Sequence, residues 1–197
     1  MEPNSIRYYQ PSGAVPFAGT ILMQLFGAIS ALVFGVIYAA VDKFVPFVFL
    51  TFFAVLFYGA GVGFAVSLGA KIGKVRNTGF VLLLGTATGV LAVYFAWVFY
   101  IYFDSKMNDL IWNPLEIFEH MRLFSNIGLW SIGSWTPTGF WLWSVWIFEA
   151  VFIVLLSLAI SISNDTPFCD DCNCWTQKTD DVASFPLTDP EQLTQDL

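Results

Sequence analysis

Four long apolar runs, separated by short polar breaks, dominate the pattern of hydrophobic and polar positions along the chain. Each run exceeds the roughly 20 residues with which an α-helix crosses the hydrocarbon core of a bilayer. Lipid cannot hydrogen-bond an open backbone, so helices are the expected form. The pattern predicts an all-α integral membrane protein built as a four-transmembrane-helix bundle. The runs cover residues 17–41, 44–70, 78–103 and 139–162.

The predicted transmembrane domain, residues 17–163, lies between a polar lead-in, residues 1–16, and a tail, residues 164–197. After Trp175 the tail is acidic, polar and proline-containing, and has too few apolar residues to form a core. Disorder is therefore the expectation for that last part of the chain.

One further helical pattern lies in the long connection between the third and fourth runs. Asn113 suits an N-cap, Pro114 the first helical position, and Glu116 the first turn, where the helix dipole favours an acid. Apolar residues then recur at three-residue steps. We expect an amphipathic helix over about residues 114–125, lying on the outer membrane surface. The alternative is a helix packed as a lid over the mouth of the bundle.

Composition agrees with a membrane protein. The chain is 57% hydrophobic and only 12% charged, against about 25% charged residues in soluble domains. The net charge of −7 is concentrated in the tail, where eight of the fifteen acidic residues follow position 163 and Lys178 is the one base. No basic face is present to neutralise phosphates, which argues against nucleic-acid binding. The lipid bilayer is the expected partner.

Lys and Arg set the predicted orientation. Lys71, Lys74 and Arg76 stand between the second and third runs and place that loop in the cytoplasm. With four spans, both termini are then cytoplasmic as well. The long connection carries Lys106 and Arg122, so the charge bias is small.

Small residues at four-residue steps form ridges on the first three runs, for example Gly59, Gly63 and Ser67 on the second. Such ridges let helix backbones approach closely in lipid. The fourth run is bulky and aromatic. We therefore expect the first three helices to pack tightly and the fourth to be more peripheral.

The three cysteines follow the fourth run in a C-x2-C-x-C pattern, Cys169, Cys172 and Cys174. This spacing is typical of metal knuckles, with zinc the first candidate cofactor. Zinc usually takes four ligands, so the fourth would come from Asp170, Asp171, a later tail carboxylate or a cysteine of a second copy. Lipidation, a thiol redox role and plain free thiols are the alternatives. A cytoplasmic tail disfavours a stable disulfide.

Glu149 is the second candidate, because it lies well inside the fourth run. A charged carboxylate at that depth costs roughly 3 kcal/mol, so we expect it to be neutral or paired inside the bundle. Thr51 and Tyr94 are at similar depth on other spans. The three form a candidate intramembrane proton or ion site. The alternative is a structural carboxyl bonded to a hydroxyl or to a partner subunit.

These features favour a non-catalytic membrane subunit or scaffold with a cytoplasmic thiol cluster that binds zinc. A small proton, ion or solute transporter or channel using Glu149 is the alternative, and a thiol redox membrane enzyme is a third. The three-thiol count and the unpaired Glu149 lead us to expect a homo-oligomer or a partner membrane protein. No catalytic set of residues is recognisable in the sequence.

Overall fold

The computed structural model describes residues 12–45, 48–107, 109–131, 133–163 and 166–176. It falls into two compact units, a helical bundle within residues 10–165 and a small unit that contains residues 166–176. Most of the lead-in, and the stretch of tail for which disorder is expected, lie outside the described residues.

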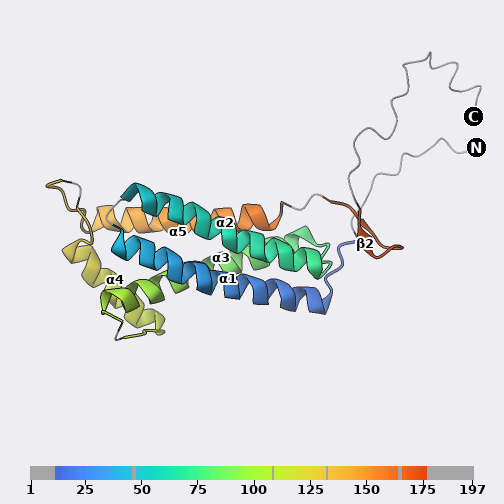
Figure 1. Cartoon of the computed structure of the whole chain (residues 1–197), viewed down its shortest axis with the longest axis horizontal. Coiled ribbons are helices and arrows are strands. Elements are labelled where there is room, and N and C mark those ends of the chain that lie inside the picture. Colours follow the sequence, from blue (N-terminus) through green and yellow to red (C-terminus); the bar gives the residue numbers. More distant parts are fainter. Residues whose placement is uncertain (1–11, 46–47, 108, 132, 164–165, 177–197) are drawn as a thin grey trace, which may run out of the picture. The chain divides into compact units, whose positions relative to one another are not determined.

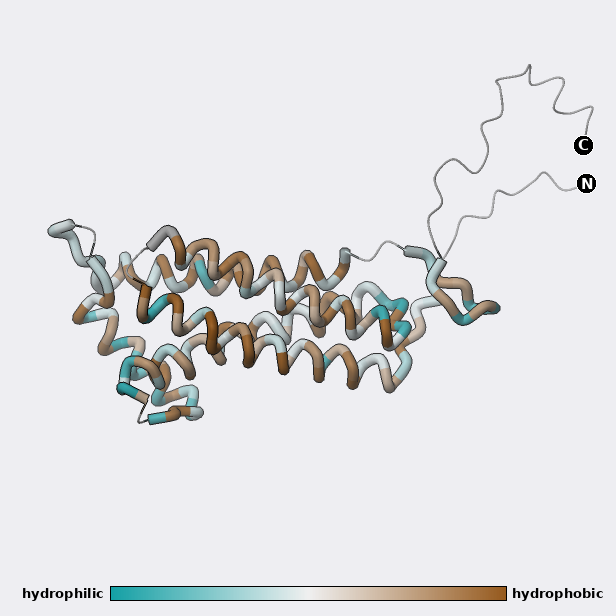
Figure 2. The backbone as a smooth tube through the Cα atoms, viewed as in Figure 1, coloured by the Kyte–Doolittle hydropathy of each residue, from teal (hydrophilic) through white to brown (hydrophobic). Residues whose placement is uncertain are grey.

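Over the described residues, the bundle consists of four long helices and one shorter helix (Figure 1). In the described residues, the four long ones are long and apolar enough to cross a membrane, which agrees with the expected multi-pass helical bundle. Figure 2 shows that apolar residues, in brown, run along these helices. The helices are α1, Phe17–Phe44; α2, Val48–Ile72; α3, Thr78–Asp104; α4, Pro114–Ile127; and α5, Phe140–Ser161.

In cross-section the four long helices form a flattened square in which α2 and α3 also contact each other. α1 packs against α2 and α3, and α5 packs against the same two helices from the other side. α1 and α5 therefore lie on a diagonal, without close backbone contact over the described residues. The end at which α1 ends and α5 begins is called the cavity end below. The opposite end, around Lys71, Lys74 and Arg76, is called the basic end.

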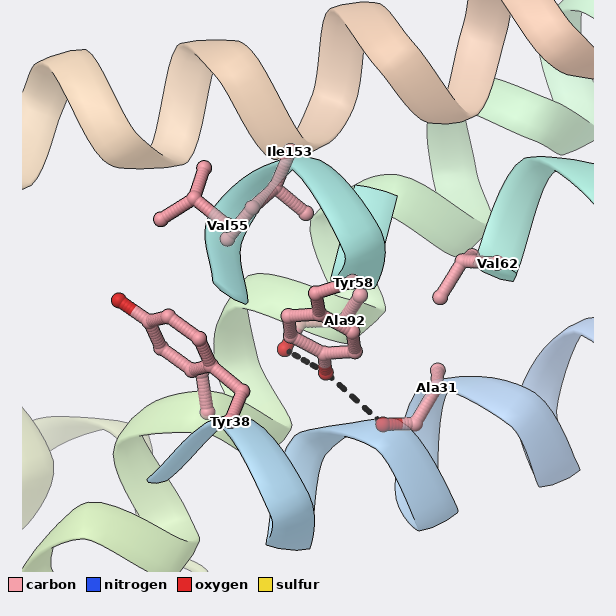
Figure 3. Close-up of a cluster of buried hydrophobic side chains, with 8 residues drawn as sticks. Ala31, Tyr38, Val55, Tyr58, Val62, Ala92 and Ile153 are labelled. Carbon is pink, nitrogen blue, oxygen red and sulfur yellow. Dashed lines mark hydrogen bonds between the residues drawn. The ribbon is translucent and has the colours of Figure 1, made fainter. Parts of the chain in front are cut away.

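The centre of the bundle is a cluster of buried side chains from all four long helices (Figure 3). The Tyr58 hydroxyl lies at its centre and approaches the carbonyl oxygens of Ala31 in α1 and Ala92 in α3, at 2.8 and 2.7 Å. One hydroxyl of α2 thus connects its two neighbours. The cluster comprises Ala31, Tyr38, Val55, Tyr58, Val62, Ala92, Ala96 and Ile153.

Glycines of α2 and α3 bring α5 close to the bundle. A Cβ at Gly63 would lie 2.5 Å from the carbonyl oxygen of Ser157 in α5, and one at Gly59 would lie 2.9 Å from that of Ile153. Ser157 in turn donates a hydrogen bond to the carbonyl of Gly85 in α3, at 3.2 Å. The fourth span is therefore seated on glycines of two helices. It is nevertheless the least buried of the four spans, with 17% of its apolar window buried, which agrees with the expectation that it would be more peripheral.

α4 begins as the sequence indicates. The Asn113 side chain accepts a hydrogen bond from the N–H of Leu115, Pro114 follows, and the helix ends at Gly128, whose φ is 81°. Ile117 is buried against Val98 and Ile101 of α3. The position of this helix at an outer membrane surface stays a prediction.

Candidate functional site: a carboxylate cavity and a cysteine hairpin

Glu149 faces the interior of the bundle at the cavity end. It lies nine residues into α5, which places it about 13 Å along the helix axis from Phe140. The Tyr38 hydroxyl of α1 donates a long hydrogen bond of 3.4 Å to its Oε2 atom. The Tyr38 ring stacks on that of Tyr58, with 5.5 Å between ring centroids, so its hydroxyl is held at a fixed place beside the carboxyl. The diagonal between α1 and α5 is bridged by these two side chains.

Two small adjoining cavities open beside this pair. They measure about 30 and 80 Å³ and share Asp42, Tyr100, Leu129, Trp146 and Glu149 in their walls. A buried water needs roughly 10–15 Å³ of such volume, so the space suits a few waters or one small ion. The cavities thus carry two carboxylates, one from α1 and one from α5.

Lys43 also borders the larger cavity, but its positive charge is paired with an acid outside the cavity walls. Its ammonium group forms an ion pair with Asp104 at the end of α3. The same ammonium lies over the Tyr100 ring, 5.6 Å from the centroid. Because Asp104 neutralises Lys43, Asp42 and Glu149 leave an excess of acid in the cavity walls.

Aromatic side chains form much of the remaining wall. Trp97 and Trp146 meet edge to face, with ring centroids 4.9 Å apart, and Tyr100 packs against Trp97 at 5.9 Å. Aromatic faces attract cations through their quadrupole, and rigid rings keep a small space from collapsing. Leu129 and Trp130 of the segment after α4 border the cavity from the loop side.

The two other residues expected beside Glu149 lie apart from it. Thr51 of α2 is buried and lines neither cavity. Tyr94 of α3 donates to the carbonyl of Trp112 instead, next to α4, and does not line either cavity.

Asp42 and Tyr100 are functional candidates that sequence reasoning missed. Asp42 looked like half of a tight polar turn, Asp42-Lys43, between two spans. In the structure α1 continues to Phe44, so Asp42 lies in its last turn and faces Glu149. The available signal was the continued helical spacing from Tyr38 to Asp42, which puts both on one face.

The cysteines lie in a small β-hairpin, which the sequence did not predict. Strand β1, Phe168–Cys169, pairs antiparallel with β2, Cys174–Trp175, and Cys169 lies opposite Cys174. The Phe168 and Trp175 rings meet edge to face, with centroids 5.0 Å apart. Asn173 closes the turn with a φ of 51°, a conformation that asparagine tolerates better than most residues.

Within this hairpin Cys169 and Cys172 interact directly. The backbone N–H of Cys172 donates to Cys169 Sγ at 3.3 Å. This N–H, together with the Cys172 thiol, lowers the pKa of Cys169 below that of an ordinary cysteine. The same thiol contact raises the pKa of Cys172. Cys172 and Cys174 are exposed and Cys169 is half-buried.

Zinc binding by Cys169, Cys172 and Cys174 stays a prediction. In the part of the chain that the structure describes, no three His, Cys, Asp or Glu side chains converge as a ready metal site. His120, the single histidine, lies on α4, where its Nδ1 contacts the carbonyl oxygen of Glu116 at 2.9 Å.

Comparison with models of protein families, with curated proteins and with solved structures finds no match for this chain.

Proposed function

We propose that this protein is a small membrane transporter or channel that takes up a proton or a small monovalent cation at the carboxylate cavity. The observation that carries the proposal is the shared cavity of Asp42 and Glu149, whose nearest cation, Lys43, is paired with Asp104. Carboxylates placed this deep in a membrane span are costly unless something neutralises them. A bound proton or cation supplies that neutralisation.

The shape of the site supports a small, weakly hydrated ligand. Cavities of about 30 and 80 Å³ leave no room for an organic solute of several heavy atoms. Tyr38 and Tyr100 bring hydroxyls to the cavity, and Trp146 brings an aromatic wall. A cation entering from the cavity end thus exchanges water for carboxylate, hydroxyl and ring contacts. By the Lys and Arg bias of the loops, that end faces the outside.

The test is flux through proteoliposomes that contain the purified protein, followed with a pH-sensitive dye and with Na⁺ and K⁺ gradients. We expect Glu149→Gln to reduce the flux at least about tenfold, because the isosteric amide cannot hold a cation or release a proton in the same way. Asp42→Asn should reduce it less, because Asp42 lies in the last turn of α1 and so nearer the end of its span than Glu149.

Glu119→Gln is the matched control, because Glu119 is an exposed residue of α4 and the same change there should leave the flux unaltered. Equal flux for Glu149→Gln and wild type would contradict the proposal. So would a folded wild-type bundle that conducts none of the tested cations.

A scaffold role with a zinc-holding tail is the second candidate, and the hairpin favours it by bringing Cys169 and Cys172 together. Its measurement is the metal content of freshly reduced protein beside a Cys172→Ser control. About one zinc per chain that the control loses would support it. About half a zinc per chain would indicate a site shared between two copies, as expected for a homo-oligomer.

A further inference from the structure

The hairpin that carries the cysteines also has the features of a thiol–disulfide exchange site. Cys172 lies three residues after Cys169, and its N–H donates to Cys169 Sγ. Both side chains are accessible, Cys172 fully and Cys169 in part. Accessibility matters because the attacking thiolate must reach a sulfur atom of the substrate disulfide without steric obstruction.

The two thiols are unequal, and the inequality has a geometric cause. Cys169 Sγ receives the N–H of Cys172 at 3.3 Å, and such a donor favours negative charge on that sulfur. Cys172 supplies this N–H, and its own thiol is exposed to water. An exchange reaction needs this division: one sulfur is ready as thiolate, and its neighbour stays protonated until the second step.

The rest of the hairpin keeps the pair in place. The strand pairing of Phe168 with Trp175, their ring contact, and the hydrogen bond from Thr176 N–H to the Pro167 carbonyl, at 2.9 Å, fix the two ends of the turn. Because the turn is fixed, the Cys172 thiol stays near the Cys169 thiol and does not have to approach it from an open conformation of the hairpin.

We infer that the Cys169–Cys172 pair is a dithiol site that reduces accessible disulfides in a partner or small molecule. In the first step the Cys169 thiolate attacks one sulfur of the substrate disulfide. A mixed disulfide forms, and the other substrate sulfur leaves as a thiolate that takes a proton from water. In the second step Cys172 loses its proton and attacks Cys169 Sγ. A Cys169–Cys172 disulfide forms, and the second substrate thiol is released.

Two electrons thus pass from the two cysteine thiols to the substrate, which ends as two thiols. A dithiol reductant of the same compartment returns the hairpin to its reduced form by the reverse exchange. The inference is independent of the cavity, because it concerns the other compact unit of the chain.

The experiment uses the full-length, reduced protein in detergent, with oxidised glutathione as the probe. Samples are quenched with acid at intervals, and intact mass spectrometry counts glutathione adducts and internal disulfides. In a Cys174→Ser background, which removes the third exposed thiol, we expect two hydrogens to be lost and no lasting adduct. Cys172→Ser should stop at one glutathione adduct on Cys169. Cys169→Ser should react several-fold more slowly at pH 7, because the sulfur that receives the Cys172 N–H is lost.

Cys174→Ser separates this inference from a zinc site. The internal disulfide should still form in that variant, whereas a three-thiolate zinc site would be lost. The inference is overturned if glutathione adducts persist on the protein that lacks Cys174, or if adding Cys169→Ser to that protein leaves its rate of reaction unchanged. It is also overturned if fresh protein releases zinc in step with thiol oxidation and Cys174→Ser abolishes that zinc.

Discussion

Tyr58 shows what a single polar side chain does inside an apolar bundle. Its hydroxyl has one proton but lies within 2.8 Å of two carbonyl oxygens, those of Ala31 and Ala92. Both carbonyls belong to helices, so the hydroxyl adds a contact to groups already bonded along the helix. In lipid such interhelical hydrogen bonds are worth about 0.6 kcal/mol on average, and at most about 1.7.

We therefore expect Tyr58→Phe to lower the free energy of unfolding by about 1 kcal/mol. Thermal unfolding in detergent, followed by the loss of helical circular dichroism, measures the change. Tyr38→Phe is the comparison, because the Tyr38 hydroxyl makes one long bond of 3.4 Å to Glu149. Tyr38→Phe should lower the free energy of unfolding by less than Tyr58→Phe does. An equal or larger loss for Tyr38→Phe would contradict this expectation.

Cys169 gives a second prediction at the same scale. Its pKa is lowered by the N–H of Cys172, then by the thiol of Cys172. Since the thiolate is the reactive form, alkylation of Cys169 should reach half its maximal rate at a lower pH than alkylation of an ordinary thiol, which is half ionised near pH 8.5. Peptide mass spectrometry after iodoacetamide pulses at different pH values measures how fast Cys169 is alkylated at each pH, for comparison with an ordinary thiol. A profile that matches free cysteine would refute the predicted shift.

At the scale of elements, glycine ridges decide which helices touch. Gly63 shows the constraint most directly, because a Cβ there would meet the Ser157 carbonyl oxygen at 2.5 Å. Backbone oxygen cannot turn aside, so α2 and α5 must separate or shift. Small residues in lipid act through this close approach rather than through burial of apolar surface.

Gly63→Ala should therefore destabilise the bundle by about 1–3 kcal/mol, the usual cost of forced overpacking. Gly79→Ala is its control, since a Cβ at Gly79 meets only the Asn77 side chain, at 3.4 Å. That change should be close to neutral. Unfolding in a detergent and denaturant series compares the two variants, and equal stability of both would contradict the proposed contact.

The same glycines show how far sequence reasoning reaches. Length and hydropathy suffice to predict four spanning helices, and the run of Asn113, Pro114 and Glu116 marks the start of α4. A ridge of small residues indicates a close contact but carries no information about its partner. Gly59 and Gly63 face α5, whose bulky sequence gave no sign of it. The candidate site depends on which helices pack together, and the sequence does not show this. For that reason Asp42 was not recognised as a neighbour of Glu149.

The cysteine hairpin was missed for a different reason. Its strands are two residues long, too short for the alternating pattern that predicts a strand. What holds it is the contact between Phe168 and Trp175, two residues that flank the cysteines. In the described part of the tail, residues 166–176, the strand pairing and this ring contact form a small folded unit.

At the scale of the whole molecule, the prediction that remains to be tested is the orientation of the protein in the membrane. If the basic end is cytoplasmic, the cysteine tail is too, and α4 lies outside. A membrane-impermeant maleimide applied to intact cells should then leave Cys169, Cys172 and Cys174 unlabelled until the cells are permeabilised.

Asn126→Cys is the matched probe for the other side, because Asn126 is an exposed residue of α4. Placed in a background with the three native cysteines changed to serine, it should be labelled on intact cells. The reverse pattern, a labelled tail and a protected α4, would invert the topology and turn the cavity toward the cytoplasm.

The depth of Glu149 makes the cavity electrically sensitive. If the hydrocarbon layer, roughly 30 Å thick, begins at Phe140, the nine residues of α5 up to Glu149 cover about 13 Å of it. A unit charge that reaches Glu149 from that side therefore crosses about 0.4 of the transmembrane potential. At about 2.3 kcal/mol per 100 mV for the full potential, this amounts to about 1 kcal/mol. A change of 100 mV in membrane voltage would thus alter occupancy of the site about fivefold, without any helix having to move.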